Sequence, residues 1–415
     1  MRINYQLFFF SIMLFLLAFD IRSFEGDSKL FIIIRAALGL IFGFLAMRKI
    51  KPNVNSKNLI LVAAFFGSYI FFIGLIRGQE IFQLFALTMP YAFFLLSILI
   101  VSSSLRDIDS LEKLINTIFI IALISVIFRI LYVTVYAGIS IDEARYTIIS
   151  PALILLFSYG LTSLLYGYKK NWLLPISIST FITLLSVTRT YLLVFLCIFI
   201  FAICVLRLKS IIKNIGLPSV LIFGTTFFIL GGLSITSSFL DVWSGRLTFD
   251  DGGILADPTL LTRVAEITFQ IRVLLENNLN MIFGMGVAAE TRFAQEFYDL
   301  LSMVFREDYE YIGAGVGHNN YVGLVYVGGI ILGSLFVLSQ LNTMLVSFTY
   351  LRKSFRDIRI KNSESFIALW GAFSTIGYLS YGMFGGIFGD RLASLSFGIA
   401  YGLMLLGIYR LQKTA

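Results

Sequence analysis

Apolar runs of about twenty residues recur along the whole chain, and they restrict the possible folds more than any other feature. A helix needs roughly 20 apolar residues to cross the hydrocarbon core of a bilayer. Only 13% of the residues are charged and 58% are hydrophobic, whereas a soluble domain carries about twice that charge. The sequence therefore predicts an all-α integral membrane protein. About twelve transmembrane segments are expected, at 5–20, 28–47, 58–76, 81–101, 112–136, 146–167, 171–188, 190–206, 216–236, 319–349, 365–383 and 391–410.

Lysine and arginine are divided unevenly between the two sets of short connections, and this indicates the orientation. One set, together with both termini, carries 19 of these residues, and the other carries six. Because basic connections stay in the cytoplasm, both termini are expected there. The net charge of +8 is thus assigned to topology rather than to nucleic-acid binding. The predicted organisation is a nine-span N-terminal membrane region (1–236), one large periplasmic loop (237–318) and a three-span C-terminal membrane region (319–415).

The predicted loop contains two amphipathic patterns separated by a break. The first helix is expected from Pro258, since proline suits the first helical position and Asp257 before it suits the N-cap. The second is expected within 288–305, and Gly284 and Gly286 interrupt the helix between them. The apolar positions at helical spacing are Leu260, Leu261, Val264, Ile267, Ile271 and Leu274 in the first, and Phe293, Phe297, Leu300, Leu301 and Val304 in the second.

Two arginines lie inside predicted spans near the outer surface. Arg35 and Arg129 are each seven residues from the outer end of their segment, or about 10 Å along a helix. One interpretation is snorkelling to headgroups, or pairing with loop acids such as Asp142 or Glu80. The other is that these arginines bind an anion arriving from outside.

Four further arginines belong to the outer side in this topology. Arg189 occupies a tight corner between two short spans, and Arg145 stands at the start of another. Arg263 falls near the beginning of the first loop helix, where free N–H groups and the helix dipole already attract phosphate. Arg246 is weaker evidence for an anion-binding site, because the acidic residues that follow it can form an ion pair with it.

His318 is the only histidine in the chain, and it lies where the loop meets an apolar run. A lone histidine is often a helix cap, which is the structural interpretation of this position. Histidine also accepts and releases protons near neutral pH, which is the functional interpretation. The arginines on the same side favour the second, and Gly313, Gly315 and Gly317 are expected to leave its approach open.

Metal and disulfide chemistry are not expected. The two cysteines, Cys197 and Cys204, lie in one apolar segment, about 10 Å apart along a helix. One histidine and two cysteines give no cluster with zinc-ligand spacing. The acidic pair at Asp107–Asp109 fits a helix start, and the "DDGG" at Asp250–Gly253 fits a solvated loop. No metal and no cofactor is therefore predicted.

Three motifs together resemble the family of O-antigen polymerases and O-antigen ligases. His318, Asn319, Asn320 and Tyr321, followed by spaced Gly329 and Gly333, resemble the signature after the large periplasmic loop. The stretch "SVTRTYLLVF" resembles the arginine-bearing junction of two spans, although the family often has Ser-Arg-Gly or Gly-Ser-Arg-Thr there. The stretch "LLTRVAEITFQIRVLLENNLNMIFGMG" resembles the loop helix with an early arginine. The order of motifs and the expected topology also agree.

The resemblance implies transfer of a saccharide from undecaprenyl diphosphate on the periplasmic face of a bacterial inner membrane. It implies lipid-linked donor and acceptor saccharides as partners, the bilayer as surroundings, and a chain-length regulator protein as a further partner. The catalytic candidates are His318, Arg189 and Arg263, and the candidates for diphosphate or sugar binding are Arg145, Arg246, Arg35, Arg129, Asn319 and Tyr321.

Three functions remain open at this point. A polymerase extends the chain on the lipid carrier, and a ligase moves it to lipid A–core. The abundance of phenylalanine, with 42 residues, and the divergent junction favour the polymerase. A flippase or exporter of lipid-linked saccharide is the alternative of another class. It is expected to place charged or polar residues at mid-depth, whereas these gather at the outer end.

Overall fold

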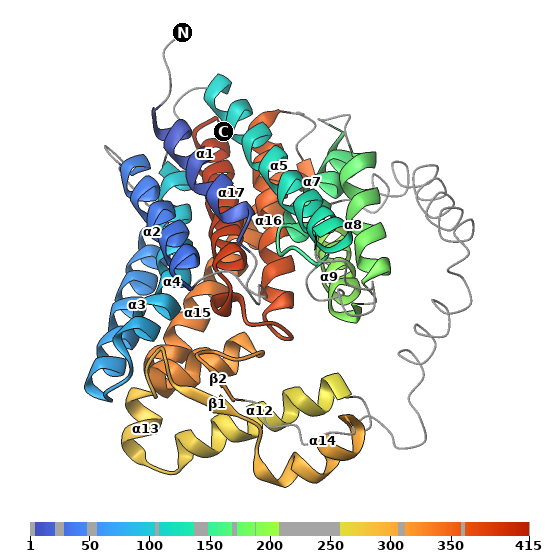
Figure 1. Cartoon of the computed structure of the whole chain (residues 1–415). Coiled ribbons are helices and arrows are strands. Elements are labelled where there is room, and N and C mark those ends of the chain that lie inside the picture. Colours follow the sequence, from blue (N-terminus) through green and yellow to red (C-terminus); the bar gives the residue numbers. More distant parts are fainter. Residues whose placement is uncertain are drawn as a thin grey trace.

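A computed structural model describes residues 5–20, 29–47, 56–103, 108–136, 148–167, 172–186, 188–206, 258–305, 312–357 and 362–414. A bundle of helices forms most of this structure, and a smaller lobe lies at one end of the bundle (Figure 1). The first residues of α1 and the last of α17 lie at the opposite end from the lobe (Figure 1).

Each predicted span that falls on described residues is a helix, and the segment 216–236 lies outside them. Among the described residues, five helices are long and apolar enough to cross a membrane: α3, α4, α5, α15 and α17. The chain is therefore largely helical and has the apolar helices of a membrane protein, while the number of spans stays a prediction. The bundle contains α1 (Tyr5–Ala18), α2 (Lys29–Ala46), α3 (Lys57–Ile76), α4 (Ile81–Ser103), α5 (Ile108–Leu131) with its π-helical continuation η2 (Tyr132–Tyr136), α7 (Leu153–Tyr166), α8 (Leu173–Leu185), α9 (Arg189–Val205), α15 (Asn320–Asp357), α16 (Ser363–Tyr381) and α17 (Arg391–Thr414).

The core of the bundle centres on α17, which packs between α4 and α16. In the most apolar 18-residue stretch of α17, 94% of the residues are buried. Small residues permit this close packing: a Cβ on Gly371 of α16 would lie 2.1 Å from the backbone nitrogen of Met404. Beside α17, the ring of Phe388 stacks on that of Tyr91 with centroids 4.5 Å apart. The corner between α16 and α17 is thereby fixed against α4.

The lobe is built from α12 (Pro258–Leu275), α13 (Asn278–Phe283), β1 (Glu290–Arg292), η4 (Gln295–Phe297), α14 (Tyr298–Phe305) and β2 (Ile312–Ala314). The first predicted loop helix is confirmed as α12, and the break at Gly284 and Gly286 is also confirmed, since both have positive φ.

The prediction for the second loop helix is wrong in its extent. Glu290–Arg292 forms a strand that pairs antiparallel with Ile312–Ala314, and the α-helix begins only at Tyr298. Hydrophobic periodicity reports local spacing, so it cannot reveal a partner strand twenty residues later. Two of its apolar residues, Phe293 and Leu301, nevertheless pack with Leu261 of α12 in one small core.

Hydrogen bonds fasten the lobe to the corner between α3 and α4. Arg77 Nη2 donates to Asn280 Oδ1 at 2.9 Å, and Gln79 Nε2 donates to the carbonyl of Met285 at 2.7 Å. Gln79 Oε1 in turn accepts from the backbone nitrogen of Ala288 at 2.9 Å. The lobe and this corner therefore lie at the same end of the bundle, and the side of the membrane that this end faces is a prediction of the charge distribution.

Cysteine labelling tests that orientation. In a background with Cys197 and Cys204 replaced by alanine, exposed Glu276 of the lobe and exposed Lys353 near the end of α15 are each changed to cysteine. A membrane-impermeant maleimide added to right-side-out spheroplasts is expected to label Glu276→Cys at once and Lys353→Cys only after lysis. The reverse pattern would overturn the topology.

A kink at Gly329 divides α15 where the lobe docks. Gly329 has φ 76° and ψ 167°, a region that essentially only glycine occupies. The kink releases two backbone carbonyls, and Met285 and Gly286 donate to those of Tyr326 and Val327, each at 2.9 Å. Gly329 therefore allows the backbone hydrogen bonds that join the lobe to the bundle.

Gly329→Ala is expected to lower the free energy of unfolding by about 3 kcal/mol or more, the upper part of the range for a residue forced into such a conformation. The added Cβ would also lie 2.1 Å from the carbonyl oxygen of Ile282. Gly78→Ala is the matched control, because Gly78 has φ 72° with nothing within 4 Å, and it should cost only about 1 kcal/mol. Thermal unfolding in detergent measures both, and equal losses would contradict a role for Gly329 in docking.

Candidate functional site

Glu266 and His318 form a hydrogen-bonded pair between α12 and the start of α15. Glu266 Oε2 accepts from the backbone nitrogen of His318 at 2.9 Å and lies 2.9 Å from His318 Nδ1. The glutamate is 1% exposed, whereas the histidine is 39% exposed. An ionised carboxylate only accepts hydrogen bonds, so the network assigns the imidazole proton to Nδ1. Nε2 is then left as a proton acceptor.

Glycine at position 317 makes this pair possible. Gly317 has φ +66°, and a Cβ there would lie 2.4 Å from Glu266 Oε1. One turn along α12, Gln270 Nε2 donates to Thr291 Oγ1 at 3.2 Å and to the carbonyl of Val316 at 3.4 Å. The expectation that the glycines keep the approach to His318 open is therefore wrong at Gly317, because the space beside it holds the Glu266 carboxylate.

The residues after His318 fasten its segment to the bundle. Asn319 Oδ1 accepts from the backbone nitrogens of Tyr321 and Val322 at 3.1 and 3.0 Å, which caps α15. Its Nδ2 donates to the carbonyl of Met383 at 3.1 Å. The hydroxyl of Tyr321 donates to the carbonyl of Leu379. These contacts tie Asn319 and Tyr321 to the end of α16 and the residues that follow it, while Glu266 contacts the imidazole.

Two of the arginines that are predicted to lie on the outer side have a common neighbour at the end of α16. Tyr381, the last residue of α16, lies within electrostatic range of Arg263 and Arg129. Arg189 is the first residue of α9 and is partly exposed. Two residues later, the ring of Tyr191 lies 5.5 Å from that of Tyr381. The charges of Arg263 and Arg129 are thus both felt at Tyr381, and the first turn of α9 lies beside the same ring.

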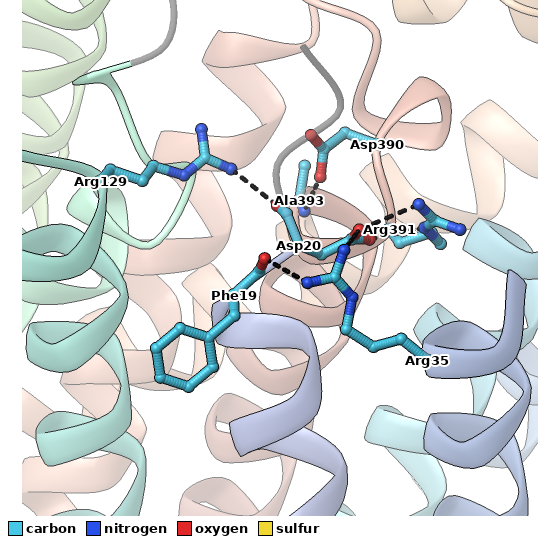
Figure 2. Close-up of polar contacts among 7 residues, drawn as sticks. All are labelled: Phe19, Asp20, Arg35, Arg129, Asp390, Arg391 and Ala393. Atoms are coloured by element: carbon cyan, nitrogen blue, oxygen red, sulfur yellow. Dashed lines mark hydrogen bonds and ion pairs between the residues drawn. The ribbon is translucent and has the colours of Figure 1, made fainter. Parts of the chain in front are cut away.

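A second polar cluster surrounds Asp20, at the end of α1 (Figure 2). Arg391 binds both carboxylate oxygens, with Nε to Oδ2 at 2.6 Å and Nη2 to Oδ1 at 3.0 Å. Arg35 Nη2 lies 3.5 Å from Oδ1. Arg129 Nη2 donates to the backbone carbonyl of Asp20 at 3.2 Å. Three guanidinium groups therefore converge on one aspartate that is 5% exposed.

This cluster gives Arg35 a carboxylate neighbour that the sequence analysis does not name. The neighbour is Asp20, and Asp142, one of the loop acids named as a partner above, lies outside the described residues. The pairing was missed because Asp20 and Arg391 were treated as the ends of separate spans. The predicted topology already placed both at the outer surface, and that shared depth is the signal that could have found the pair.

Glu266 is the second residue of the site that the sequence analysis does not name. The signal was present in "RVAEITFQ", where Glu266 and Gln270 are four residues apart in an otherwise apolar pattern. Residues at i and i+4 share one helical face, so this polar pair had to be either solvated or buried with partners. Both are 1% exposed, and their partners come from the segment around His318.

The remaining candidates lie outside the described residues. These are Arg145 and Arg246, and the acidic residues Asp250 and Asp251 also lie outside the described residues. Within the part of the chain that the structure describes, no three His, Cys, Asp or Glu side chains are grouped as metal ligands.

Comparisons with known proteins give no family assignment. A scan against models of protein families finds no match to this chain. A search of curated proteins likewise finds no match. The chemistry of the site is therefore argued from its own residues and contacts.

Proposed function

We propose that this protein is a membrane glycosyltransferase that takes a saccharide from a polyprenyl diphosphate carrier. The favoured reaction is polymerisation of O-antigen or a related surface polysaccharide on the periplasmic face of the inner membrane. The observation that carries this proposal is the Glu266–His318 pair, because it combines a buried carboxylate with an accessible imidazole. Arg263 stands one turn before Glu266 on the same helix.

The chemistry needs a base for the acceptor and a stabiliser for the leaving group. The acceptor hydroxyl oxygen attacks the anomeric carbon of the donor sugar while the bond from that carbon to the diphosphate oxygen breaks. The hydroxyl proton passes to His318 Nε2, and the Glu266 carboxylate stabilises the resulting imidazolium. Arg263 and Arg189 are assigned to the departing diphosphate, whose oxygens match the guanidinium fork.

Transfer is expected to proceed without a divalent metal, because the arginines stabilise the charge that a metal ion stabilises in many phosphate-leaving reactions. Purified protein with a defined lipid-linked substrate should therefore keep its initial rate, within about twofold, in excess EDTA. A loss of activity that magnesium restores would contradict this expectation. The acidic residues Asp250, Asp251 and Asp257 would then be the first ligands to test.

The positions of buried charges favour an enzyme over a flippase. Asp20 and Arg391 lie at helix ends, and Arg129 lies in the last turn of α5. At the other end of the bundle, Glu364 in the first turn of α16 pairs with Arg410 at 3.7 Å. Within the described helices, the buried charges thus avoid mid-depth, where a polar transport path is expected.

A chromosomal deletion with gel display of surface polysaccharide tests the proposal. A polymerase predicts loss of the ladder while one repeat unit remains on lipid A–core. Loss of all core substitution, with polymer retained on the carrier, would indicate a ligase. Accumulation of lipid-linked repeat units on the cytoplasmic face would indicate a flippase.

A further inference from the structure

After its first residue, α13 turns its polar side chain inward and its apolar side chains outward. Asn280 is partly buried: its Oδ1 accepts from Arg77 Nη2 at 2.9 Å, and its Nδ2 donates to the carbonyl of Val273 at 3.1 Å. The exposed side chains on the other face, at helical spacing, are Leu279, Ile282 and Phe283. This arrangement is the reverse of that of a helix in water and suits apolar surroundings.

Hydrogen bonds to α3 fix the depth of the end of α13. The hydroxyl of Tyr69 donates to the carbonyl of Phe283 at 3.0 Å, and the backbone nitrogen of Val287 donates to the carbonyl of Ile70 at 3.1 Å. Ile70 lies six residues before Ile76, the last residue of α3, which is about 9 Å along the helix. The end of α13 and the segment after it therefore lie beside the interior of α3.

Hydrogen bonds to α15 give the same depth independently. The backbone nitrogen of Met285 donates to the carbonyl of Tyr326 at 2.9 Å. Tyr326 lies six residues after Asn320, the first residue of α15, which is again about 9 Å along the helix. Both α3 and α15 are long and apolar enough to cross a membrane. The end of α13 thus lies at the depth at which both helices are within the bilayer.

The exposed face of α13 continues the apolar surfaces of these two helices. The carbonyl oxygen of Ile282 packs against Gly329 of α15, because a Cβ on Gly329 would lie 2.1 Å from it. On α3, the residues one turn before and one turn after Tyr69 share its face. The exposed apolar residues beside these two contacts are Phe65, Phe72, Ile330 and Ile331. Figure 1 shows α13 next to the end of α3.

We propose that α13 is an interfacial helix, and that Leu279, Ile282 and Phe283 insert among the lipids of the leaflet on the lobe's side of the bilayer. Amphipathic helices at a membrane surface bury their apolar face about 5–10 Å into the boundary between headgroups and acyl chains. The hydrogen bonds to α3 and α15 place the end of α13 at that depth. Because α12 leads directly into α13, this lipid contact also fixes the height of the lobe at the membrane surface, whatever reaction the protein performs.

Spin labels on the full chain test the proposal in nanodiscs of phosphatidylcholine and phosphatidylglycerol that hold one chain each. In a background with Cys197 and Cys204 replaced by alanine, Leu279→Cys and Phe283→Cys carry a nitroxide. Oxygen concentrates in hydrocarbon and a nickel chelate stays in water, so oxygen should relax both labels more strongly than nickel does. Leu300→Cys on α14 is the matched control, since Leu300 is 44% exposed and Phe283 is 45% exposed. Its label lies beside the exposed Asp299, so nickel should relax it more strongly.

Three results would overturn the proposal. Stronger relaxation by nickel at Leu279→Cys and Phe283→Cys would place α13 in water, which is also the result expected if this face binds a second copy of the chain. Weak relaxation by both reagents would mean that another part of the same chain covers the face. A bimane fluorophore on the same cysteines should be quenched more by lipids brominated near the headgroup than by lipids brominated near the chain end, and the reverse order would place α13 too deep for an interfacial helix.

Discussion

His318→Ala is expected to lower the rate of saccharide transfer by about 10² to 10⁴, the usual contribution of a general base. His318→Gln should lose nearly as much, because glutamine can hold the acceptor hydroxyl but cannot take its proton. Initial rates at matched protein levels measure these effects, and near-normal activity in His318→Gln would reduce the residue to an orienting role.

Glu266→Gln tests whether Glu266 acts on the reaction through His318 or only supports the local fold. The amide keeps the volume beside Gly317 but removes the negative charge that stabilises the imidazolium, so a large loss of rate is again expected. Glu290→Gln is the matched control, since Glu290 is 49% exposed and pairs with Arg292. If both glutamine variants behave alike, Glu266 does not act through His318.

Arg263→Lys is expected to lower the rate of transfer by about a hundredfold, in the range for losing one group that stabilises developing charge. Lysine keeps the charge but lacks the planar fork that binds two phosphate oxygens. Arg189→Lys should behave similarly at the start of α9. Arg272→Lys provides a control on the same helix as Arg263, because its side chain pairs with Glu296 instead. Wild-type rates in both Arg263→Lys and Arg189→Lys would remove these residues from the site.

The helices were predictable because each predicted segment is a continuous apolar run, which is a local signal. The break at Gly284 was also predictable from a local signal, because glycine interrupts helices. The strand at Glu290–Arg292 was not, because its partner is supplied by a later segment. The lesson is that local spacing identifies elements but not the pairings between them.

The two polar clusters depend on contacts that are distant in sequence. Glu266 and His318 are 52 residues apart, and Asp20 and Arg391 are 371 apart. The uneven distribution of lysine and arginine predicts that His318 and the arginines lie on one side of the membrane. It does not identify the residues that each of them contacts. Each cluster is completed by a buried carboxylate, Glu266 in one and Asp20 in the other, and the sequence pattern alone names neither as a partner.

The bond between Asp20 and Arg391 joins the first described helix to the last one. During synthesis Asp20 enters the membrane long before Arg391 is made, so for most of translation Asp20 lacks the arginine that binds both its oxygens. A chain released early, without α17, would leave the outer cluster unassembled. The ion pair, and with it the cluster around Asp20, can therefore assemble only after α17 has been synthesised.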